Sequence, residues 1–147
     1  MKDDSPINII EDIWHYLSPF SAHQIDIWGE RFCTAEHAYQ CAKFVKSKER
    51  EEVKNANSPL GAWRTAQKYK SVETLCIKDF DKDKVMEQIF RAKIEQHIDI
   101  LEILKLSEGR GFLKIHALDF YWGTGADGSG QNKMGKMWMK LREDLLG

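Results

Sequence analysis

The sequence predicts a helix-rich α+β fold in a single domain that spans residues 1–147. Three observations support this fold class: a short alternating pattern near the N-terminus, several helix start signals in the middle, and apolar residues at helical spacing towards the C-terminus. With 147 residues, 42% of them apolar, the chain can bury one hydrophobic core without disulfides or metals. No repeat or low-complexity linker divides it.

The N-terminal part predicts a short β-hairpin. Residues 24–28 alternate between polar and apolar side chains, and a second β-like run, residues 31–33, follows Gly29-Glu30. A two-residue loop that begins with glycine suits a type II′ turn. We therefore expect two short antiparallel strands joined at Gly29-Glu30.

The middle of the chain carries helix start signals. Thr34 can cap a helix that runs to about Lys48, and Ser47 offers a further start. Ser58-Pro59 offers another, because proline is tolerated in the first turn of a helix. The middle is therefore expected to be helical.

The C-terminal half predicts a long helix, a short strand, a loop and a last helix. Asp81 or Asp83 opens the long helix, which we expect to break near Asp99. Residues 112–115 indicate a short strand, and residues 123–130 form a loop with four glycines. The last helix is expected to begin at a cap, Asn132, and to pack through Met134, Trp138, Leu141 and Leu145.

Composition argues against several protein classes. Lys plus Arg total 22 and Asp plus Glu total 23, so no net field attracts polyanions in general. The three cysteines, Cys33, Cys41 and Cys76, lack C-x-x-C spacing and are expected to be reduced core thiols. No leader-like segment and no membrane-length apolar run is present, so we expect a cytoplasmic protein that does not bind membranes. Neither a metal site nor a cofactor is expected, since no Cys and His cluster has ligand spacing.

Four polar side chains share one stripe of the first predicted helix. Glu36, Gln40, Lys43 and Ser47 lie on this stripe, opposite an apolar one. One interpretation is an ordinary amphipathic helix with a solvated face. The other is a catalytic stripe, because Glu36 falls in the first turn, where helix amides keep a carboxylate ionised.

Lys93 and His97 fall within the apolar stripe of the longest predicted helix. Lysine is rarely placed in such a stripe. Its stem can cover apolar surface while the ammonium reaches water or a carboxylate. Alternatively, desolvation leaves part of the amine neutral and able to attack an aldehyde carbon. His97 is either a hydrogen-bonded core histidine or part of the same site.

The glycine-rich loop and the residues before it form a third candidate feature. Glycines let backbone amides approach a phosphate or ribose, and Tyr121 and Trp122 could stack on a planar base. The glycine spacing fits neither a P-loop nor a dinucleotide-binding fingerprint. A merely flexible loop is the alternative interpretation.

Four segments together resemble a known family. Residues 17–20 read Leu-Ser-Pro-Phe, and residues 32–44 contain Glu-His followed by Gln and Lys-Phe. Residues 91–97 read Arg-Ala-Lys-Ile-Glu-Gln-His, and residues 119–136 begin with Asp-x-x-Trp-Gly and continue through the glycines to Asn132 and Gly135. In this order the segments resemble the NADAR/YbiA-like family from about Tyr16 to Leu145.

The resemblance implies a hydrolase that cleaves the N-glycosidic bond of ribosylated substrates. The implied substrates are ADP-ribose on guanine, and hence ADP-ribosylated nucleic acid, or phosphoribosylamino-pyrimidine intermediates of riboflavin synthesis. A module that binds ADP-ribose or a related NAD derivative without cleaving it is the main alternative. A purely structural domain is a third.

The motifs and the residue patterns together give the candidate site. The candidate catalytic residues are Glu36, Lys43, Lys93 and Asp119. The candidate substrate-binding residues are Gln40, Arg64, His97, Trp122, Gly123, Gly125, Asp127 and Asn132. Glu36 is the first choice for the carboxylate, and a Schiff base would use Lys43 or Lys93. Lys114 stands where the family usually has a glutamate, so this strand is not expected to supply a catalytic acid.

Overall fold

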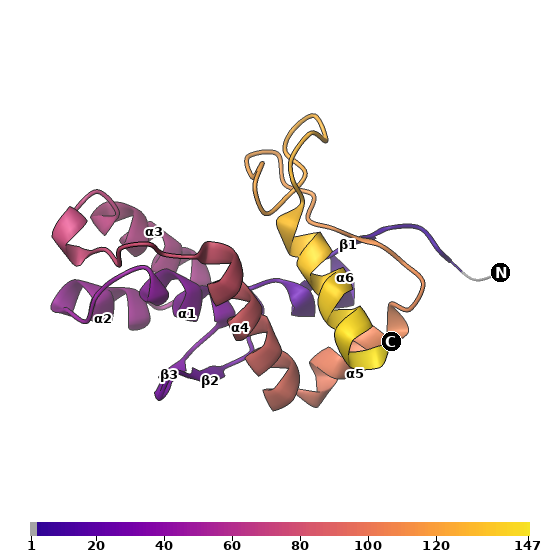
Figure 1. Ribbon diagram of the computed structural model, residues 1–147, viewed down its shortest axis with the longest axis horizontal. Helices are drawn as coiled ribbons and strands as arrows, with labels where there is room; N and C mark the ends of the chain where they lie inside the picture. The colour runs from indigo at the N-terminus through magenta and orange to yellow at the C-terminus, as the bar shows by residue number, and fades with distance from the viewer. Residues whose placement is uncertain (1–2) are drawn as a thin grey trace. The chain divides into compact units, whose positions relative to one another are not determined.

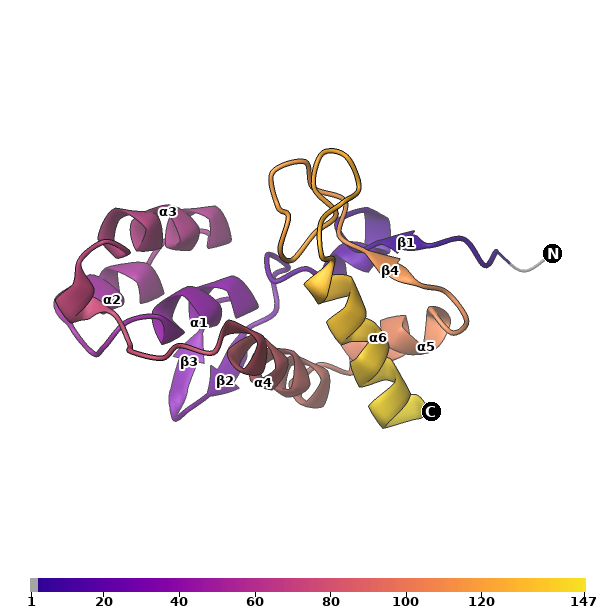
Figure 2. The ribbon, with the colours of Figure 1, turned by 45° about the horizontal axis from the view of Figure 1, so that its top comes forward.

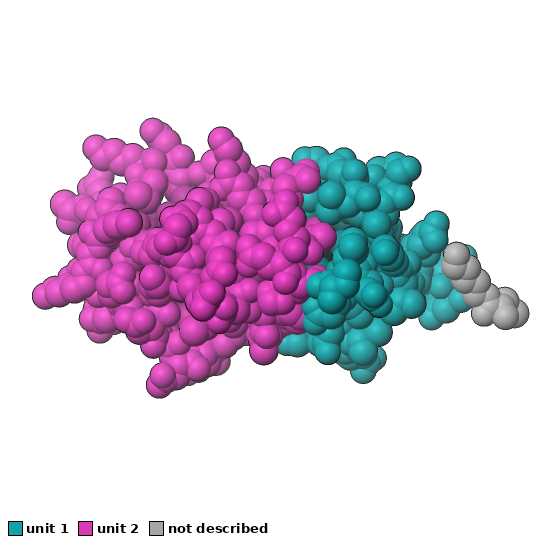
Figure 3. Space-filling model, turned by 90° about the horizontal axis from the view of Figure 1, so that it is seen from below, with its two compact units in different colours: residues 1–18, 98–147 teal, residues 19–97 magenta. Residues whose placement is uncertain are grey.

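A computed structural model describes residues 3–147, and its chain divides into two compact units. One unit is residues 19–97, and the other combines residues 1–18 with residues 98–147 (Figure 3). Helices dominate both units, and each contains one small two-stranded sheet (Figure 1). This confirms the helix-rich α+β fold, whereas a single domain over residues 1–147 stays a prediction.

The unit of residues 19–97 begins with a hairpin and continues in helices. Strands β2 (Ile25–Ile27) and β3 (Glu30–Phe32) pair antiparallel. The helices that follow are α1 (Ala35–Ala42), α2 (Lys48–Lys54), α3 (Pro59–Tyr69), the short 3-10 helix η2 (Glu73–Leu75) and α4 (Lys82–Gln96). Helix α1 packs against α2, α3 and α4, and α2 and α3 lie side by side (Figure 2). The core of this unit is therefore built around α1.

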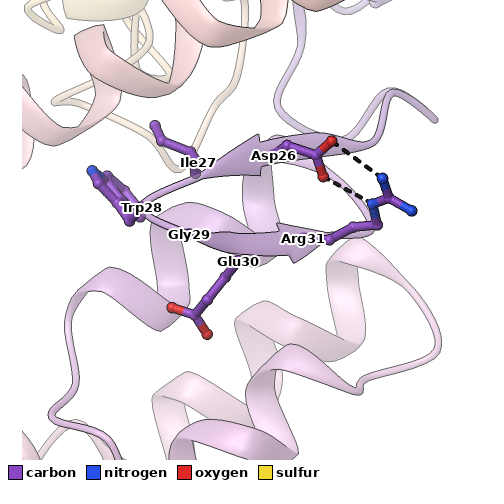
Figure 4. A pocket seen from close by; sticks show the side chains of 6 residues that line it. All are labelled: Asp26, Ile27, Trp28, Gly29, Glu30 and Arg31. Carbon is purple, nitrogen blue, oxygen red and sulfur yellow. Dashed lines mark hydrogen bonds and ion pairs between the residues drawn. The ribbon is translucent and has the colours of Figure 1, made fainter.

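The hairpin forms where it was predicted, but its turn differs. The loop residues are Trp28 and Gly29, with φ of 54° and 76°, so both central residues are left-handed as in a type I′ turn. Glu30 pairs with Ile27 in the ladder instead of lying in the loop. Figure 4 shows the ion pair of Asp26 and Arg31 across the strands and Trp28 at the tip. The predicted Gly29-Glu30 loop was therefore wrong by one residue.

The predicted helix starts are confirmed, and one predicted helix end is wrong. The side chains of Thr34, Ser47 and Ser58 each accept a hydrogen bond from a first-turn amide. The helix after Thr34 ends at Ala42, not near Lys48, because the next residues pair with residues 75–77. The amide of Val45 donates to the carbonyl of Leu75, for example, at 2.8 Å.

Helix α4 begins and ends as the sequence indicated. Asp81, not Asp83, is the cap, and its carboxylate accepts from the amide of Lys84 at 3.1 Å. The helix ends at Gln96, and the next residue, His97, has an extended backbone (φ −132°), close to the break expected near Asp99.

The second unit joins the two ends of the chain. Strand β1 (Ile7–Asn8) pairs in parallel with β4 (Phe112–Leu113), which is shorter than the expected strand over residues 112–115. The other elements are the 3-10 helix η1 (Asp12–Leu17), α5 (Ile98–Leu106) and α6 (Lys133–Leu146). Trp138 is fully buried, and its indole Nε1 donates to the carbonyl of Leu17 at 2.9 Å.

Two expectations about single residues need correction. Cys33 is exposed and Cys76 is partly exposed, so only Cys41 is a core thiol, and burial raises its pKa to about 12. Asn132 precedes α6 but does not cap it with its side chain. The side chain instead bridges to β4 and the next residue, accepting from the amide of Lys114 and donating to the carbonyl of Phe112. Within residues 3–147, no helix is long and apolar enough to span a bilayer.

Candidate active site

The polar stripe of α1 is buried, not solvated. Glu36 and Gln40 are 6% and 2% exposed, respectively. The amide of Gln40 donates from Nε2 to Glu36 Oε1 at 2.8 Å. Because a buried carboxylate loses hydration, it is retained only where partners or function compensate for that loss. The structure therefore removes the solvated-face interpretation of this stripe.

Gln40 presents a buried acceptor without a donor. Its Oε1 has no hydrogen-bond partner among residues 3–147, although the side chain is almost fully enclosed. Flipping the amide would turn an oxygen towards Glu36 Oε1, so the arrangement with Nε2 on Glu36 is the favoured one. An unsatisfied buried acceptor is costly, and a bound hydroxyl or amine would remove that cost.

Lys43 ends this stripe and is electrostatically linked to it. Its Nζ lies 4.8 Å from the centre of the Tyr39 ring. Burial lowers the pKa of the Lys43 amine, and the negative charge of Glu36 opposes part of that decrease. Glu36 and Gln40 of α1, with Lys43 at its C-terminal cap, thus form a connected group, which we call the α1 stripe.

The start of α1 is held by several side chains. Thr34 caps the helix and also bonds His37 Nδ1 at 2.8 Å, while His37 Nε2 bonds the carbonyl of Ala56 at 2.9 Å. The amide of Glu36 donates to the carbonyl of Pro19 at 3.1 Å. These contacts fix the turn from which Glu36 projects.

Lys93 is fully buried in α4, which packs against α1. Its Nζ donates to the hydroxyl of Ser21 at 2.6 Å, so the ammonium does not reach water by snorkelling. Ser21 Oγ lies 2.8 Å from His23 Nδ1. No pattern in the sequence pointed to Ser21 or His23, because they belong to a loop without periodicity. The only signal that could have pointed to them was the adjoining Pro19-Phe20 of the family motif.

The remaining candidates of this unit are less enclosed. His97 is partly exposed, and its Nε2 lies 2.6 Å from the carbonyl of Gln24, so the ring is tied to the loop before β2. Arg64 is exposed on α3 and has no ion-pair partner among the described residues. Arg64 is therefore available to a phosphate, whereas His97 Nε2 is already engaged.

In the other unit, Asp119 organises the segment before the glycine-rich loop. Its Oδ1 accepts from the amides of Tyr121 and Trp122, and its Oδ2 pairs with Lys114 Nζ at 2.7 Å. Burial acts to raise the pKa of Asp119, but the bond and charge of Lys114 and the two amides outweigh burial and lower it. Lys114, where the resemblance led us to expect a glutamate, is thus the ion-pair partner of Asp119.

The glycine-rich loop is tightly folded, which contradicts the flexible-loop interpretation. Its amides bond internally, for example Gly130 to the carbonyl of Thr124 at 2.6 Å and Gln131 to that of Phe120 at 2.8 Å. A Cβ at Gly123 would lie 2.7 Å from the carbonyl oxygen of Lys114, and one at Gly125 would meet the ring of Phe120. These glycines therefore permit close packing within the loop, and most of its amides are already used.

Two further candidates lie near the surface of this loop. Trp122 is partly exposed and packs edge-on against Tyr121, with ring centroids 4.9 Å apart. Asp127 is exposed, and hydrogen bonds from the side chain and amide of Ser129 lower its pKa. The candidate residues thus form two groups, one in each unit.

Comparisons with known proteins place the chain in a family. The model of the NADAR domain matches residues 10–146. The chain belongs to the NADAR domain family. It is 34% identical to the N-glycosidase YbiA of Shigella flexneri serotype 5b, covering 99% of this chain and 91% of that protein. It is 32% identical to the riboflavin biosynthesis protein VVA0006 of Vibrio vulnificus, covering 88% of this chain and 35% of that protein.

A solved NADAR-family structure has the same fold. The NMR structure of the E. coli protein YbiA superposes with a TM-score of 0.83 at 32% identity, covering 99% of this chain and 87% of that chain. Together with the named N-glycosidases, this makes the present NADAR chain an N-glycosyl hydrolase.

Proposed function

We propose that this N-glycosyl hydrolase cleaves a small phosphoribosylated substrate and that the α1 stripe supplies the carboxylate for the reaction. The observation that carries the proposal is the buried Glu36–Gln40 pair, in which Gln40 Oε1 lacks a donor. A ribose hydroxyl or an exocyclic amine of the substrate would satisfy this acceptor. Enzymes tolerate such unsatisfied groups where a ligand completes them.

Cleavage of a ribosyl N-glycoside builds positive charge on the anomeric carbon. The carboxylate of Glu36 would stabilise that charge and activate water, while a second group protonates the departing nitrogen. Lys43 and the exposed Arg64 belong to the same unit and are suited to hold phosphate. Trp122 and Asp127 belong to the other unit, and their contacts with the base and with ribose hydroxyls stay predictions from the motif resemblance.

A Schiff-base route is the second mechanism that these residues support. The ribose opens, a neutral lysine amine attacks C1, and the base leaves with a proton as an imine forms between C1 and Nζ. Water then adds to C1 and releases the lysine amine and the free sugar. We place this role on Lys93, whose amine is fully buried, and Lys43 is the alternative.

The name of the Vibrio vulnificus relative favours riboflavin-pathway substrates. Phosphoribosylamino-pyrimidines are free small molecules, which agrees with a net charge of −1 that gives no general attraction to nucleic acid. ADP-ribose on guanine is the other substrate class, and non-catalytic binding is the other functional class. Mass spectrometry of the products from both substrates would distinguish these possibilities.

The test of the α1 stripe uses Glu36→Gln with Glu95→Gln as its control. Glu95 is an exposed glutamate on α4 outside the stripe. We expect Glu36→Gln to fold and to lose most turnover, roughly 10²-fold or more, because an amide neither accepts a proton nor offsets positive charge. Glu95→Gln should remain as active as the wild type. A folded Glu36→Gln variant with the wild-type rate would exclude the proposed role of Glu36.

A further inference from the structure

Lys93, Ser21 and His23 form a continuous buried hydrogen-bonded chain. The three residues are 0%, 1% and 7% exposed, respectively. Lys93 Nζ lies 2.6 Å from Ser21 Oγ, which lies 2.8 Å from His23 Nδ1. The chain joins α4 to a loop 72 residues earlier in the sequence. Two titratable groups are thus connected through one hydroxyl in a water-poor environment.

The direction of the hydrogen bonds follows from the chemistry of the three groups. An ammonium can only donate, so Ser21 Oγ accepts from Lys93. The single hydroxyl proton of Ser21 is then directed to His23 Nδ1, which accepts when the imidazole carries its proton on Nε2. The chain is therefore arranged to pass a proton from lysine towards histidine.

We propose that Ser21 and His23 are positioning residues that form a proton relay for Lys93. A proton leaves Lys93 Nζ for Ser21 Oγ while the Ser21 hydroxyl proton moves to His23 Nδ1. The products are a neutral lysine amine and an imidazolium, so one positive charge is kept. The reverse transfer returns the proton when the imine is hydrolysed. This inference rests on the proposed Schiff-base route through Lys93.

A dedicated relay is useful here because the amine must lose a proton before it can attack. A free lysine amine binds its proton about 4 pH units more tightly than a free imidazole, so the neutral amine is the minor species. Lys93 is fully buried, and solvent therefore has no direct path to its ammonium. A prearranged acceptor supplies that path without opening the core.

Other titratable groups lie in the elements around this hydrogen-bonded chain. The His97 ring packs edge-on against His23, with centroids 4.9 Å apart, and its Nε2 bonds the carbonyl of Gln24. Helix α1 brings Glu36 to the same core, while Asp26 of β2 is exposed and paired with Arg31. Within residues 19–97, the Ser21 hydroxyl joins Lys93 to His23.

The decisive variant is His23→Asn, because asparagine keeps an acceptor near the position of Nδ1 but takes no proton. Ser21→Ala breaks the chain, and Ser21→Thr keeps its hydroxyl. His116→Asn, at an exposed histidine that is not part of the hydrogen-bonded chain of Lys93, Ser21 and His23, is the matched control. All are compared as full-length proteins after thermal melts confirm folding.

We expect His23→Asn and Ser21→Ala to lower kcat/KM at neutral pH by roughly 10²-fold, with activity recovering as pH rises, because a larger fraction of the lysine is then neutral without the relay. Ser21→Thr and His116→Asn should keep the wild-type pH profile. A folded His23→Asn protein with the wild-type rate and profile would overturn the relay and leave a structural role for the hydrogen bonds.

A second readout needs no substrate. Nitrogen-15 NMR of the free wild-type protein should show His23 Nδ1 as an unprotonated acceptor, and Ser21→Ala should shift the titrations of both His23 and Lys93. A proton on Nδ1, or titrations that Ser21→Ala leaves unchanged, would overturn the relay even if the enzyme is active. If the relay signature is present but neither substrate class is cleaved, the proposed function fails and the relay does not.

Discussion

At the scale of single residues, the proposed chemistry rests on buried ionisable groups. Glu36 and Lys93 are enclosed by the fold, yet neither is needed to build an apolar core. Each is held by a hydrogen bond to a neutral side chain, Gln40 or Ser21. Burying such groups costs free energy that their partners must offset, and perturbed groups of this kind concentrate at functional sites, which is why we place the proposed reaction on them.

The role of Lys93 can be tested by trapping. Borohydride added during turnover should attach sugar mass to the wild-type protein at Lys93. Lys93→Arg stays cationic and Lys93→Met keeps much of the stem packing, and both should lack the adduct and turnover. Peptide mapping by mass spectrometry is the measurement. An adduct on Lys43 would move the nucleophile there, and turnover without any adduct would favour water activated by Glu36.

Glu30 should contribute stability that depends on pH. Arg50 bonds both its carboxylate oxygens, at 2.8 and 2.7 Å, and Lys54 adds a third contact. The Arg50 bonds are the main cause that lowers the pKa of Glu30 to about 2. Because the folded-state pKa is the lower one, this stability is present above about pH 4.5 and is lost as pH falls towards 2.

We expect the contribution of Glu30 to be on the order of 1–2 kcal/mol, allowing for solvent screening. Denaturant unfolding at pH 7 and pH 3 measures it. The wild type should lose more stability on acidification than Glu30→Gln, since glutamine has no proton to bind. Equal losses in both proteins would show that the ion pair contributes nothing measurable.

At the scale of elements, the hairpin turn stores backbone strain. Trp28 has φ of 54°, a left-handed conformation that costs a bulky residue about 1–2 kcal/mol. Asparagine adopts this conformation readily before glycine in a type I′ turn. We therefore expect Trp28→Asn to raise stability by about 1 kcal/mol in thermal unfolding. A loss of stability would mean that the edge contact of Trp28 with Phe32 outweighs the strain.

The glycine-rich loop should be sensitive to a single methyl group at Gly125. A Cβ there would meet the Phe120 ring, and φ is +71°. We expect Gly125→Ala to cost about 2–4 kcal/mol, from backbone strain and overpacking together. Gly128→Ala is the control: it shares the positive φ, +80°, but its Cβ meets nothing within 4 Å, so about 1 kcal/mol is expected. Denaturant unfolding measures both losses of stability. Equal losses in Gly125→Ala and Gly128→Ala would mean that the loop rearranges to accommodate the added methyl group.

At the scale of the whole molecule, chain connectivity links the two units. The unit of residues 1–18 and 98–147 can form only when its two segments meet across the intervening residues 19–97. Closing an unfolded loop of roughly 80 residues costs on the order of 4 kcal/mol. Folding of residues 19–97 shortens that loop, so the two units should stabilise each other through the chain alone.

We therefore expect one cooperative unfolding transition, with a calorimetric enthalpy of about 100 kcal/mol for a chain of this length. The enthalpy should equal the van't Hoff value, as two-state unfolding requires. Differential scanning calorimetry is the measurement, and a destabilising change in one unit, Gly125→Ala, should shift the whole transition. Two separate transitions would contradict the single domain that the sequence predicts.

Local signals determined much of the fold and part of the site. Caps at Thr34, Ser47 and Ser58 are set by side chains within three residues of the amides they bind, so the sequence alone predicts them. Helical periodicity likewise placed Lys93 on a buried face. The family motifs grouped residues that lie far apart in the sequence and that no local pattern could connect. The match of the NADAR domain model confirmed that the chain belongs to this family.

Tertiary structure decided what depends on partners distant in the sequence. The helix after Thr34 ends at Ala42 because residues 75–77 pair with the chain that follows. The stripe of Glu36 looks solvated in an isolated helix, and only packing of other helices against α1 buries it. Ser21 becomes the partner of Lys93 across 72 residues, a separation over which neither propensity nor periodicity carries information.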